Sequence, residues 1–331
     1  MRILLFILLL FILPGAIVGL VELGLRSIFG FGQPLLYVTD PKIGYLLAPS
    51  QTTRRFGNRI TINQYSMRNA SITPQRSPDT LRILLLGDSI ANGGWWTDQN
   101  QTISALLQDD LQTKLPTDQP IASAPGKFQQ VEVLNASANS WSPRNQLAYL
   151  QRFGSFESQA IVLLINTDDL FGIAPTSVQV GRDSNYPSTK PPFALAEVIQ
   201  RYLFKSKPIP ELVQFQQAGG DRVGENLAAI GQIQAITVQS NAQFFLVITP
   251  LLRELKPPGA RDYEKVARDR LQAFTKTEGI LFLDVLPLFA DHPEPEKLYR
   301  DHIHLSAIGN RELVKLIRTT PLRPPILGGT E

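Results

Sequence analysis

A small set of side chains limits the chemistry that this chain can perform. It contains three histidines, His292, His302 and His304, and it has no cysteine. Without cysteine, disulfides, thiolate metal sites, iron–sulfur clusters and a cysteine nucleophile are all excluded. Any imidazole that acts as a general base must therefore be one of these three histidines.

One serine stands where a nucleophile is expected. Ser89 follows a Gly-Asp turn at the end of the apolar run 81–87, and a strand-to-helix corner there can expose a hydroxyl beside free backbone N–H groups. Such a serine needs a base, and His304 comes three residues after Asp301, so one short loop can hold both. We predict that His304 takes the proton of Ser89 and that Asp301 holds the imidazole in the required tautomer.

Other roles for these residues stay open at this point. Ser89 can also be the N-cap of a helix, and His304 can be a hydrogen-bonded loop histidine. A third interpretation is a metal site in which His302 and His304 bind with Asp291 or Asp301, although carboxylates at the spacing of a closed site are not evident.

The elements that position these residues alternate between strands and helices from residue 81 onward. Short apolar runs predict five buried strands, at 81–87, 130–135, 160–166, 243–249 and 280–285. Amphipathic periodicity and start signals predict helices at 101–115, 143–153, 193–205, 222–239, 261–278 and 305–318. The last but one of these helices carries Tyr263, Val266, Leu271 and Phe274 on one side. Apolar strands separated by helices predict an α/β fold: a three-layer α/β/α domain with a five-stranded parallel, flavodoxin-like sheet.

In such sheets ligands bind outside the carboxyl ends of the strands. Ser89 follows the first strand, the segment 135–141 follows the second, the segment 166–169 follows the third, and the segment 301–304 follows the fifth at a distance. The polar candidates are therefore expected at one rim of the sheet.

Composition and charge bound the class of protein. Of the 331 residues 43% are hydrophobic and 18% are charged, which is enough apolar material for a folded core. The 32 basic and 29 acidic residues leave a net charge of +3 with no long Lys/Arg run, so no nucleic-acid partner is expected.

We divide the chain into four parts. They are a membrane anchor or signal segment at 1–26, an irregular Pro- and Gly-rich neck at 27–80 that packs on the main domain, the main domain at 81–320 and a tail at 321–331.

The N-terminal segment is predicted to be an anchor. Residues 3–21 carry no charge, and 19 residues of helix reach about 28 Å, close to the thickness of a bilayer core. A cleaved signal peptide and a buried core helix are the alternatives. We expect a membrane helix over 3–21 with the remaining chain on the exported, periplasmic or extracytoplasmic side.

Two blocks of the main domain resemble the SGNH/GDSL hydrolase family. The first is Ile83-Leu-Leu-Leu-Gly-Asp-Ser-Ile90, and the last is Asp301-His-Ile-His304-Leu-Ser-Ala-Ile-Gly309. The neck segment 62–68 is also similar to that of membrane-anchored bacterial members. The resemblance implies a serine ester hydrolase with Ser89 as nucleophile, acting without a cofactor on an acyl or O-acetyl ester, with an envelope glycan or lipid as the expected substrate.

The middle blocks depart from the family pattern. The resemblance implies an oxyanion hole that includes Ser89, but the usual Gly of the second block is Ser140, and the usual Asn of the third block is Asp168. A backbone N–H survives the first change, whereas an ionised Asp cannot donate a hydrogen bond to an oxyanion. A protonated Asp168, a donor such as Asn139 or Asn166, or slow hydrolysis are the three explanations left open.

The same departure keeps other activities open. The triad can pass an acyl group to a glycan hydroxyl instead of water, or the fold can serve a non-catalytic binding protein. Trp95 and Trp96 follow the nucleophile closely and can stack on a substrate sugar or pack in the core. The segment 172–192 can cover the cleft or form an ordinary surface loop. Asn139 and Trp95 are our candidate substrate contacts.

Overall fold

A parallel sheet of five strands forms the centre of the protein in this computed structural model, which describes residues 12–114, 128–204 and 207–320. The strand order is β6-β5-β7-β8-β9, and every neighbouring pair is parallel. The strands are β5 (Thr80–Gly87), β6 (Gln130–Ser137), β7 (Ala160–Asn166), β8 (Gln243–Thr249) and β9 (Leu281–Asp284). The predicted sheet is therefore confirmed, with strand ends within two residues of those expected from the apolar runs.

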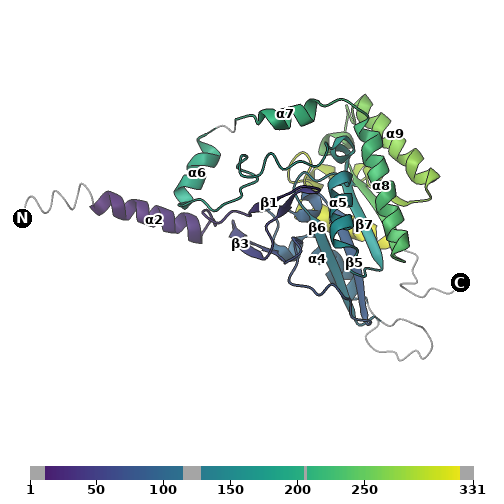
Figure 1. Ribbon diagram of the computed structural model, residues 1–331, viewed down its shortest axis with the longest axis horizontal. Helices are drawn as coiled ribbons and strands as arrows, with labels where there is room; N and C mark the ends of the chain where they lie inside the picture. Colours follow the sequence, from purple (N-terminus) through teal and green to yellow (C-terminus); the bar gives the residue numbers. More distant parts are fainter. Residues whose placement is uncertain (1–11, 115–127, 205–206, 321–331) are drawn as a thin grey trace, which may run out of the picture.

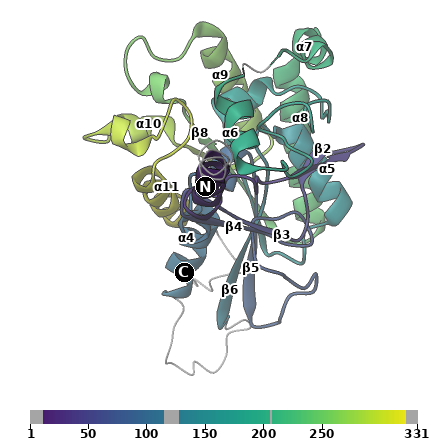
Figure 2. The same ribbon diagram turned by 90° about the vertical axis from the view of Figure 1, so that its left-hand side faces the viewer.

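Helices cover both faces of this sheet (Figure 2). One core joins alternate side chains of the strands to the helices α5 (Pro143–Phe153), α8 (Arg222–Gln239) and α9 (Asp262–Thr277). The other joins the remaining strand side chains to α4 (Ile103–Gln112), α10 (Leu286–Ala290) and α11 (Ala307–Thr319). On β5, for example, Leu84 and Leu86 belong to the first core, whereas Ile83 and Leu85 belong to the second. Because successive strand residues point to opposite faces, an uninterrupted apolar run fills both cores. The predicted three-layer α/β/α architecture is confirmed.

Most helices lie where their periodicity and caps predict. They are α4 (Ile103–Gln112), α5 (Pro143–Phe153), α6 (Ala194–Tyr202), α8 (Arg222–Gln239), α9 (Asp262–Thr277) and α11 (Ala307–Thr319). The segment 173–192 contains neither helix nor strand. The helix expected after the corner at Ser89 is the short α3 (Ser89–Asn92), and two further helices were not expected from the sequence: α7 (Pro210–Gln217) and α10 (Leu286–Ala290).

The neck contains more structure than its breaker residues suggest. It forms two antiparallel hairpins, β1 (Tyr37–Asp40) with β2 (Gly44–Leu47) and β3 (Gln51–Arg55) with β4 (Asn58–Ile62). The first hairpin packs against the second predicted site segment, since Tyr45 donates its hydroxyl to the carbonyl of Asn139 and accepts the indole N–H of Trp141 at its own carbonyl.

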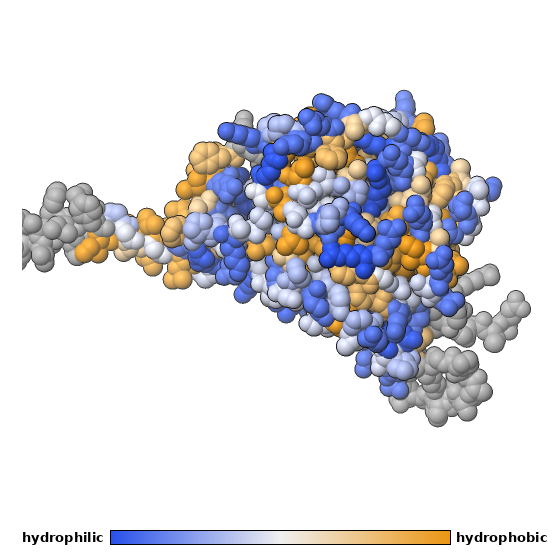
Figure 3. Space-filling model, in the orientation of Figure 1, coloured by the Kyte–Doolittle hydropathy of each residue, from blue (hydrophilic) through white to orange (hydrophobic). Residues whose placement is uncertain are grey.

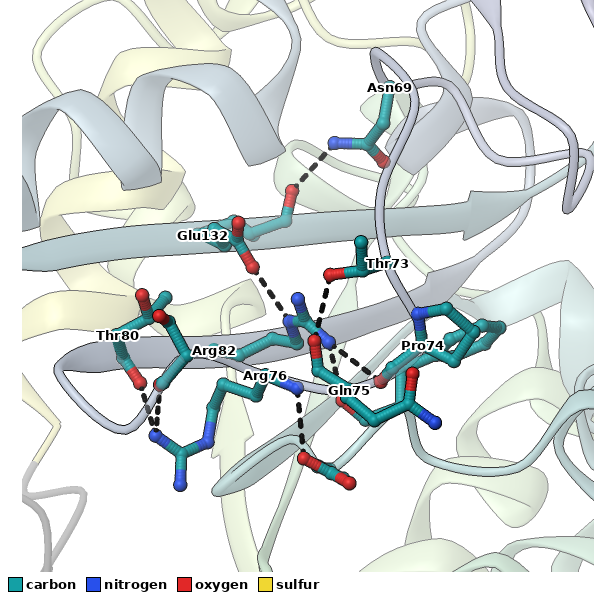
Figure 4. A network of polar contacts seen from close by, with 12 residues as sticks. Asn69, Thr73, Pro74, Gln75, Arg76, Thr80, Arg82 and Glu132 are labelled. Atoms are coloured by element: carbon teal, nitrogen blue, oxygen red, sulfur yellow. Dashed lines mark hydrogen bonds and ion pairs between the residues drawn. The ribbon is translucent and has the colours of Figure 1, made fainter.

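A buried arginine joins the end of the neck to the sheet (Figure 4). Arg82 on β5 pairs with Glu132 on β6 at 2.7 Å and donates to the carbonyls of Pro74 and Phe156, each at 2.9 Å. These partners satisfy a guanidinium that is only 1% exposed. The contact lies at the amino ends of the strands, away from the rim that carries Ser89, and it therefore has a structural role.

The N-terminal helix α2 (Leu13–Ser27) projects from the body (Figure 1). Residues 3–11 of the predicted membrane helix lie outside the described residues, and α2 contains residues 13–21 of it. Across the part of the chain that the structure describes, no helix is both long and apolar enough to cross a membrane. The membrane helix over 3–21 therefore stays a prediction.

Candidate active site

Ser89 lies at the corner between β5 and α3. It is the first residue of α3, and the N-cap is its neighbour Asp88, whose Oδ1 accepts the N–H of Ile90 at 2.8 Å. The interpretation of Ser89 as the N-cap is therefore wrong, because the cap that this corner needs is supplied by the preceding carboxylate. The Ser89 hydroxyl is left to face the loop that follows β9.

The loop that follows β9 brings His304 and Asp301 to Ser89. His304 Nε2 lies 2.9 Å from Ser89 Oγ, and His304 Nδ1 lies 2.8 Å from Asp301 Oδ2. Asp301 also accepts the backbone N–H groups of Ile303 and His304 at 3.0 and 2.8 Å, which makes the loop a tight turn around its carboxylate. The three side chains that we selected from the sequence form one hydrogen-bonded row.

The charges around this row favour an ionised Asp301. Burial raises the pKa of its carboxyl, but the backbone N–H groups of His304 and Ile303 and the imidazole of His304 outweigh that effect and lower the pKa below its usual value. The buried Asp88 differs, because desolvation raises the pKa of its carboxyl despite the N–H of Ile90. An ionised Asp301 is the state that can hold a proton on His304 Nδ1 and leave Nε2 free to accept from Ser89.

Two backbone N–H groups at this rim, those of Ser89 and Ser140, have no hydrogen-bond acceptor among the described residues. Ser140 has φ = 58°, in the left-handed region where glycine is least strained. Its hydroxyl accepts the phenol of Tyr186 at 2.8 Å, a contact that ties the segment 173–192 to the rim. A backbone donor is thus retained where Ser140 replaces the family's usual glycine.

The third site segment contains an exposed carboxylate in place of an amide. Asp168 lies in the short helix η3 (Thr167–Phe171), and its side chain is exposed to solvent. Partial desolvation and the charge of Glu264 raise the pKa of Asp168, against the opposing charges of Arg253, His302 and Arg261. Desolvation is the largest of the effects that raise this pKa, although Asp168 is an exposed residue of η3.

The two asparagines considered as replacement donors differ in their surroundings. Asn166 is buried, and its amide donates to Asp88 at 2.8 Å and to Asp169 at 3.0 Å, so both of its protons are already used. Asn166 is therefore unsuited to bind an oxyanion, although it fixes the carboxylate beneath Ser89. Asn139 is half-buried, and no hydrogen bond of its amide nitrogen is found among the described residues.

The tryptophan pair and an arginine border the histidine. The ring of Trp96 lies 4.4 Å from that of His304, and Trp95 packs edge-on against Trp96 at 5.7 Å. The guanidinium of Arg300 lies about equally far from both indoles, at 5.0 Å from Trp95 and 4.9 Å from Trp96. Trp96 therefore packs on the imidazole, while the more exposed Trp95 presents an indole to solvent near the site.

The metal interpretation finds no support in the geometry. Among residues 12–114, 128–204 and 207–320 there is no group of three His, Asp or Glu side chains that could hold a metal ion. His302 is largely exposed and lies 4.0 Å from Asp301, whose carboxylate already binds His304.

A buried arginine from the neck supports the loop that carries the tryptophans, and sequence analysis did not select it. Arg68 is 1% exposed and donates to the carbonyls of Asn92, Gly94 and Thr97. Burial lowers its pKa to about 10, against the raising effect of the Asp98 charge. Its only sequence signal is its place at the end of the segment 62–68. Arg68 thus links the neck to the corner that begins at Ser89.

Replacing Arg68 by methionine should destabilise the protein by about 2–4 kcal/mol, because several buried carbonyls would lose their donor at once. Urea unfolding followed by circular dichroism measures the change. Arg54→Met is the matched control, since Arg54 belongs to the same neck but its side chain is exposed. Equal stability of the two variants would show that Arg68 does not hold this loop.

Comparison with known proteins agrees with the fold. The sequence model described as the GDSL-like lipase/acylhydrolase family matches residues 85–312. No curated protein matches the chain.

Several solved structures match about seven tenths of the chain or more at low sequence identity. They include an α/β-hydrolase enzyme from the metagenome of Lake Arreo, Spain, which is 14% identical over 72% of this chain and 94% of its own, with a TM-score of 0.47. An acetylxylan esterase from Geobacillus stearothermophilus is 13% identical over 75% and 97%, with a TM-score of 0.48. A lipase/acylhydrolase from Enterococcus faecalis is 13% identical over 71% and 92%, with a TM-score of 0.41.

The family match covers more than two thirds of the chain and includes both the corner at Ser89 and the loop that holds Asp301 and His304. With these residues in one hydrogen-bonded row at the rim of a parallel sheet, the chain belongs to the GDSL-like lipase/acylhydrolase family.

Proposed function

We propose that this chain is a serine hydrolase that cleaves an acyl or O-acetyl ester. Ser89 Oγ attacks the ester carbonyl while His304 Nε2 accepts the hydroxyl proton, and the imidazolium then gives that proton to the departing alcohol. Water attacks the resulting acyl-serine with His304 again as the base, which releases the carboxylic acid and restores Ser89. Asp301 keeps the imidazole oriented and stabilises its charged form.

Two backbone N–H groups are our candidate donors to the developing negative charge. We assign the oxyanion hole to the backbone N–H groups of Ser89 and Ser140, which have no acceptor among the described residues. Asp168 stands where the family usually supplies a side-chain donor, and its carboxylate opposes the oxyanion when it is ionised. We therefore assign this chain a hydrolase activity that is slower near neutral pH than the triad alone would allow.

The observation that carries this proposal is the row of contacts from Ser89 through His304 to Asp301, with separations of 2.9 and 2.8 Å. A loop histidine with a structural role has no need to approach the first residue of α3, 215 positions earlier in the chain. The row also supplies, in order, the nucleophile, the base and the carboxylate that orients the base, which are the three groups that acyl transfer requires.

The substrate class and location extend this proposal. We place the ester on an envelope glycan or lipid on the exported side of a membrane, where the uncharged segment 3–21 would anchor the chain. The exposed Trp95 near the site supports a substrate with a sugar ring or an acyl chain, because an indole can pack on either. Asn139 is the polar side chain proposed to contact the same substrate.

Labelling with a fluorophosphonate probe tests the proposed function. The wild-type chain should form a covalent adduct at Ser89, and Ser89→Ala should lose it completely. Ser188→Ala, which changes an exposed serine of the segment 173–192, should label as the wild type does. Intact mass spectrometry measures the adduct. An unlabelled wild type, or a Ser89→Ala variant that still labels, would contradict the assignment.

A further inference from the structure

The end of the protein from which α2 emerges carries an unusual exposed apolar surface. No residue of α2 is buried, although most of its side chains are hydrophobic. Around its base lie five more large hydrophobic side chains with exposures between 61% and 74%; they are Ile28, Phe193, Tyr202, Leu203 and Phe204, and we call them the apolar collar. Figure 3 shows hydrophobic residues on α2 and on the adjoining end of the body. Soluble monomers seldom expose large hydrophobic groups in such a cluster.

The collar is held rigidly against α2. Glu22 of α2 accepts the backbone N–H groups of Ala194 and Leu195 at 2.7 and 2.9 Å, so it satisfies the first turn of α6. Glu197 of α6 is buried and pairs with Arg55 of the neck at 2.7 Å. Arg26 donates to the carbonyl of Pro192 at 3.1 Å. These polar contacts fix α6 beside the base of α2, with the collar side chains left outside.

A row of aromatic rings leads from the collar to the active site. Each neighbouring pair of rings is separated by 4.4 to 6.2 Å between centroids. In order, the rings are Tyr202, Phe31, Phe56, Trp95, Trp96 and His304. Phe56 and Trp95 in the middle of the row are each about two-fifths exposed, at 40% and 41%. The row passes through Phe31, which is buried, so ring packing connects the collar on α6 with the exposed Phe56 and Trp95 beside the histidine.

We propose that the collar and the exposed side of α2 rest on a lipid bilayer, with α6 lying in the interface beside the inserted N-terminal segment. The occupant is inferred from continuity: the first part of α2 belongs to the uncharged run 3–21, so the chain that leads into the collar has the composition of a lipid-embedded segment. Phenylalanine and tyrosine at its base suit the interfacial zone, where aromatic rings gather. The helix α2 also projects from the body, as an inserted helix would (Figure 1).

This arrangement deepens the proposed substrate class and rests on the proposed function for that step. With the collar on lipid, the aromatic row connects the membrane-bound end of the domain to Trp96 and His304 beside Ser89. The ester that reaches it is then one presented at the membrane surface, such as the acyl ester of a lipid or of a lipid-linked glycan, in preference to a freely diffusing one.

Depth-dependent quenching tests the docking surface without any need for catalysis. Because the chain has no cysteine, a single cysteine can be placed and labelled with an environment-sensitive dye in the full-length Ser89→Ala protein. Leu203→Cys reports on the collar, Ile17→Cys reports on α2, and Val238→Cys on α8 is the control at the opposite end (Figure 1). The proteins are reconstituted into phosphatidylcholine–phosphatidylglycerol vesicles with and without doxyl-labelled phosphatidylcholine.

The proposal requires blue-shifted emission and quenching by doxyl lipid at positions 203 and 17, and neither effect at position 238. Quenching at 17 alone would overturn it, because α2 would then insert while the collar stays in water. A blue shift at 203 without lipid quenching would also overturn it and would indicate that protein covers the collar. Since Ser89→Ala is used throughout, failure of docking is distinct from failure of the proposed hydrolase, which probe labelling decides separately.

Discussion

Replacing Asp301 by asparagine is expected to lower kcat for ester hydrolysis by about four orders of magnitude, with KM and the fold little changed. Asp301 accepts from His304 Nδ1 at 2.8 Å, so it selects the tautomer whose Nε2 can receive the proton of Ser89. Asparagine can donate to Nδ1 instead, which moves the imidazole proton to Nε2 and removes the base. Steady-state kinetics with an activated acetyl or acyl ester measures the loss.

Two further variants make this result specific. His304→Ala should lose activity to at least the same extent, and the double variant should be no worse than His304→Ala, because members of one catalytic unit are not additive. His302→Ala is the matched control and should keep its rate, since that imidazole is exposed and its Nδ1 is 4.0 Å from Asp301. A His302→Ala loss as large as that of His304→Ala would contradict the assigned row.

The lowered pKa of Asp301 should also change how the free energy of unfolding depends on pH. Its ionised form is favoured by the folded state, so its contribution is present above the ordinary carboxyl pKa and is lost as pH falls through the lowered folded value. The free energy of unfolding of Asp301→Asn should accordingly fall less steeply than that of the wild type on acidification in this range.

The sheet and the position of the site rim could be predicted because both depend on local and periodic features. An apolar run such as 160–166 must be a strand buried on both faces, and the structure has β7 over the same residues. The carboxyl ends of parallel strands meet at one edge, so Ser89 and the segment 166–169 had to be close in space. The position of His304 followed from its place beside Asp301 and before the last helix.

Helix faces were predicted less well where packing overrides hydropathy. In α9 the residues Tyr263 and Val266 are exposed, whereas Glu264 and Arg268 are buried beside Ala267 and Leu271. The reason is an internal polar network, in which Arg268 pairs with Asp284 and donates to Thr167, so charged side chains occupy the covered face. Periodicity cannot identify such a face because it ranks residues by hydropathy alone.

Contacts between residues far apart in the chain could also not be predicted from the sequence. Arg68 binds carbonyls of the corner at 92–97, and Tyr186 binds Ser140 from a segment without helix or strand. Neither contact joins residues at a regular helix or strand spacing. The contacts form only once the neck and the segment 173–192 have folded against the main domain. The exposure of Asp168, which lies in the short helix η3, likewise could not be predicted from its neighbours in sequence.

Replacing Asp168 by asparagine is expected to raise kcat by up to about two orders of magnitude, because it exchanges a charge that opposes the oxyanion for a neutral amide that can donate to it. The titration of this carboxylate should be visible in the pH dependence of the wild-type hydrolysis rate. Partial desolvation and the Glu264 charge raise the pKa of Asp168, so it loses its proton, and its ability to donate, as pH rises through that raised value. Hydrolysis should decline on the same limb, and the decline should disappear in Asp168→Asn.

Two variants separate the charge from the missing donor. Asp168→Ala removes the charge without adding a donor, and it should recover only part of the gain of Asp168→Asn while losing the same alkaline decline. Asp262→Asn, at a fully exposed carboxylate on the neighbouring α9, should leave both kcat and the pH profile unchanged. Since an oxyanion forms only in the transition state, the gain should lie in kcat with KM nearly constant. If Asp168→Asn behaves like Asp262→Asn, Asp168 does not face the oxyanion, and Ser89 and Ser140 must stabilise it by their backbone N–H groups alone.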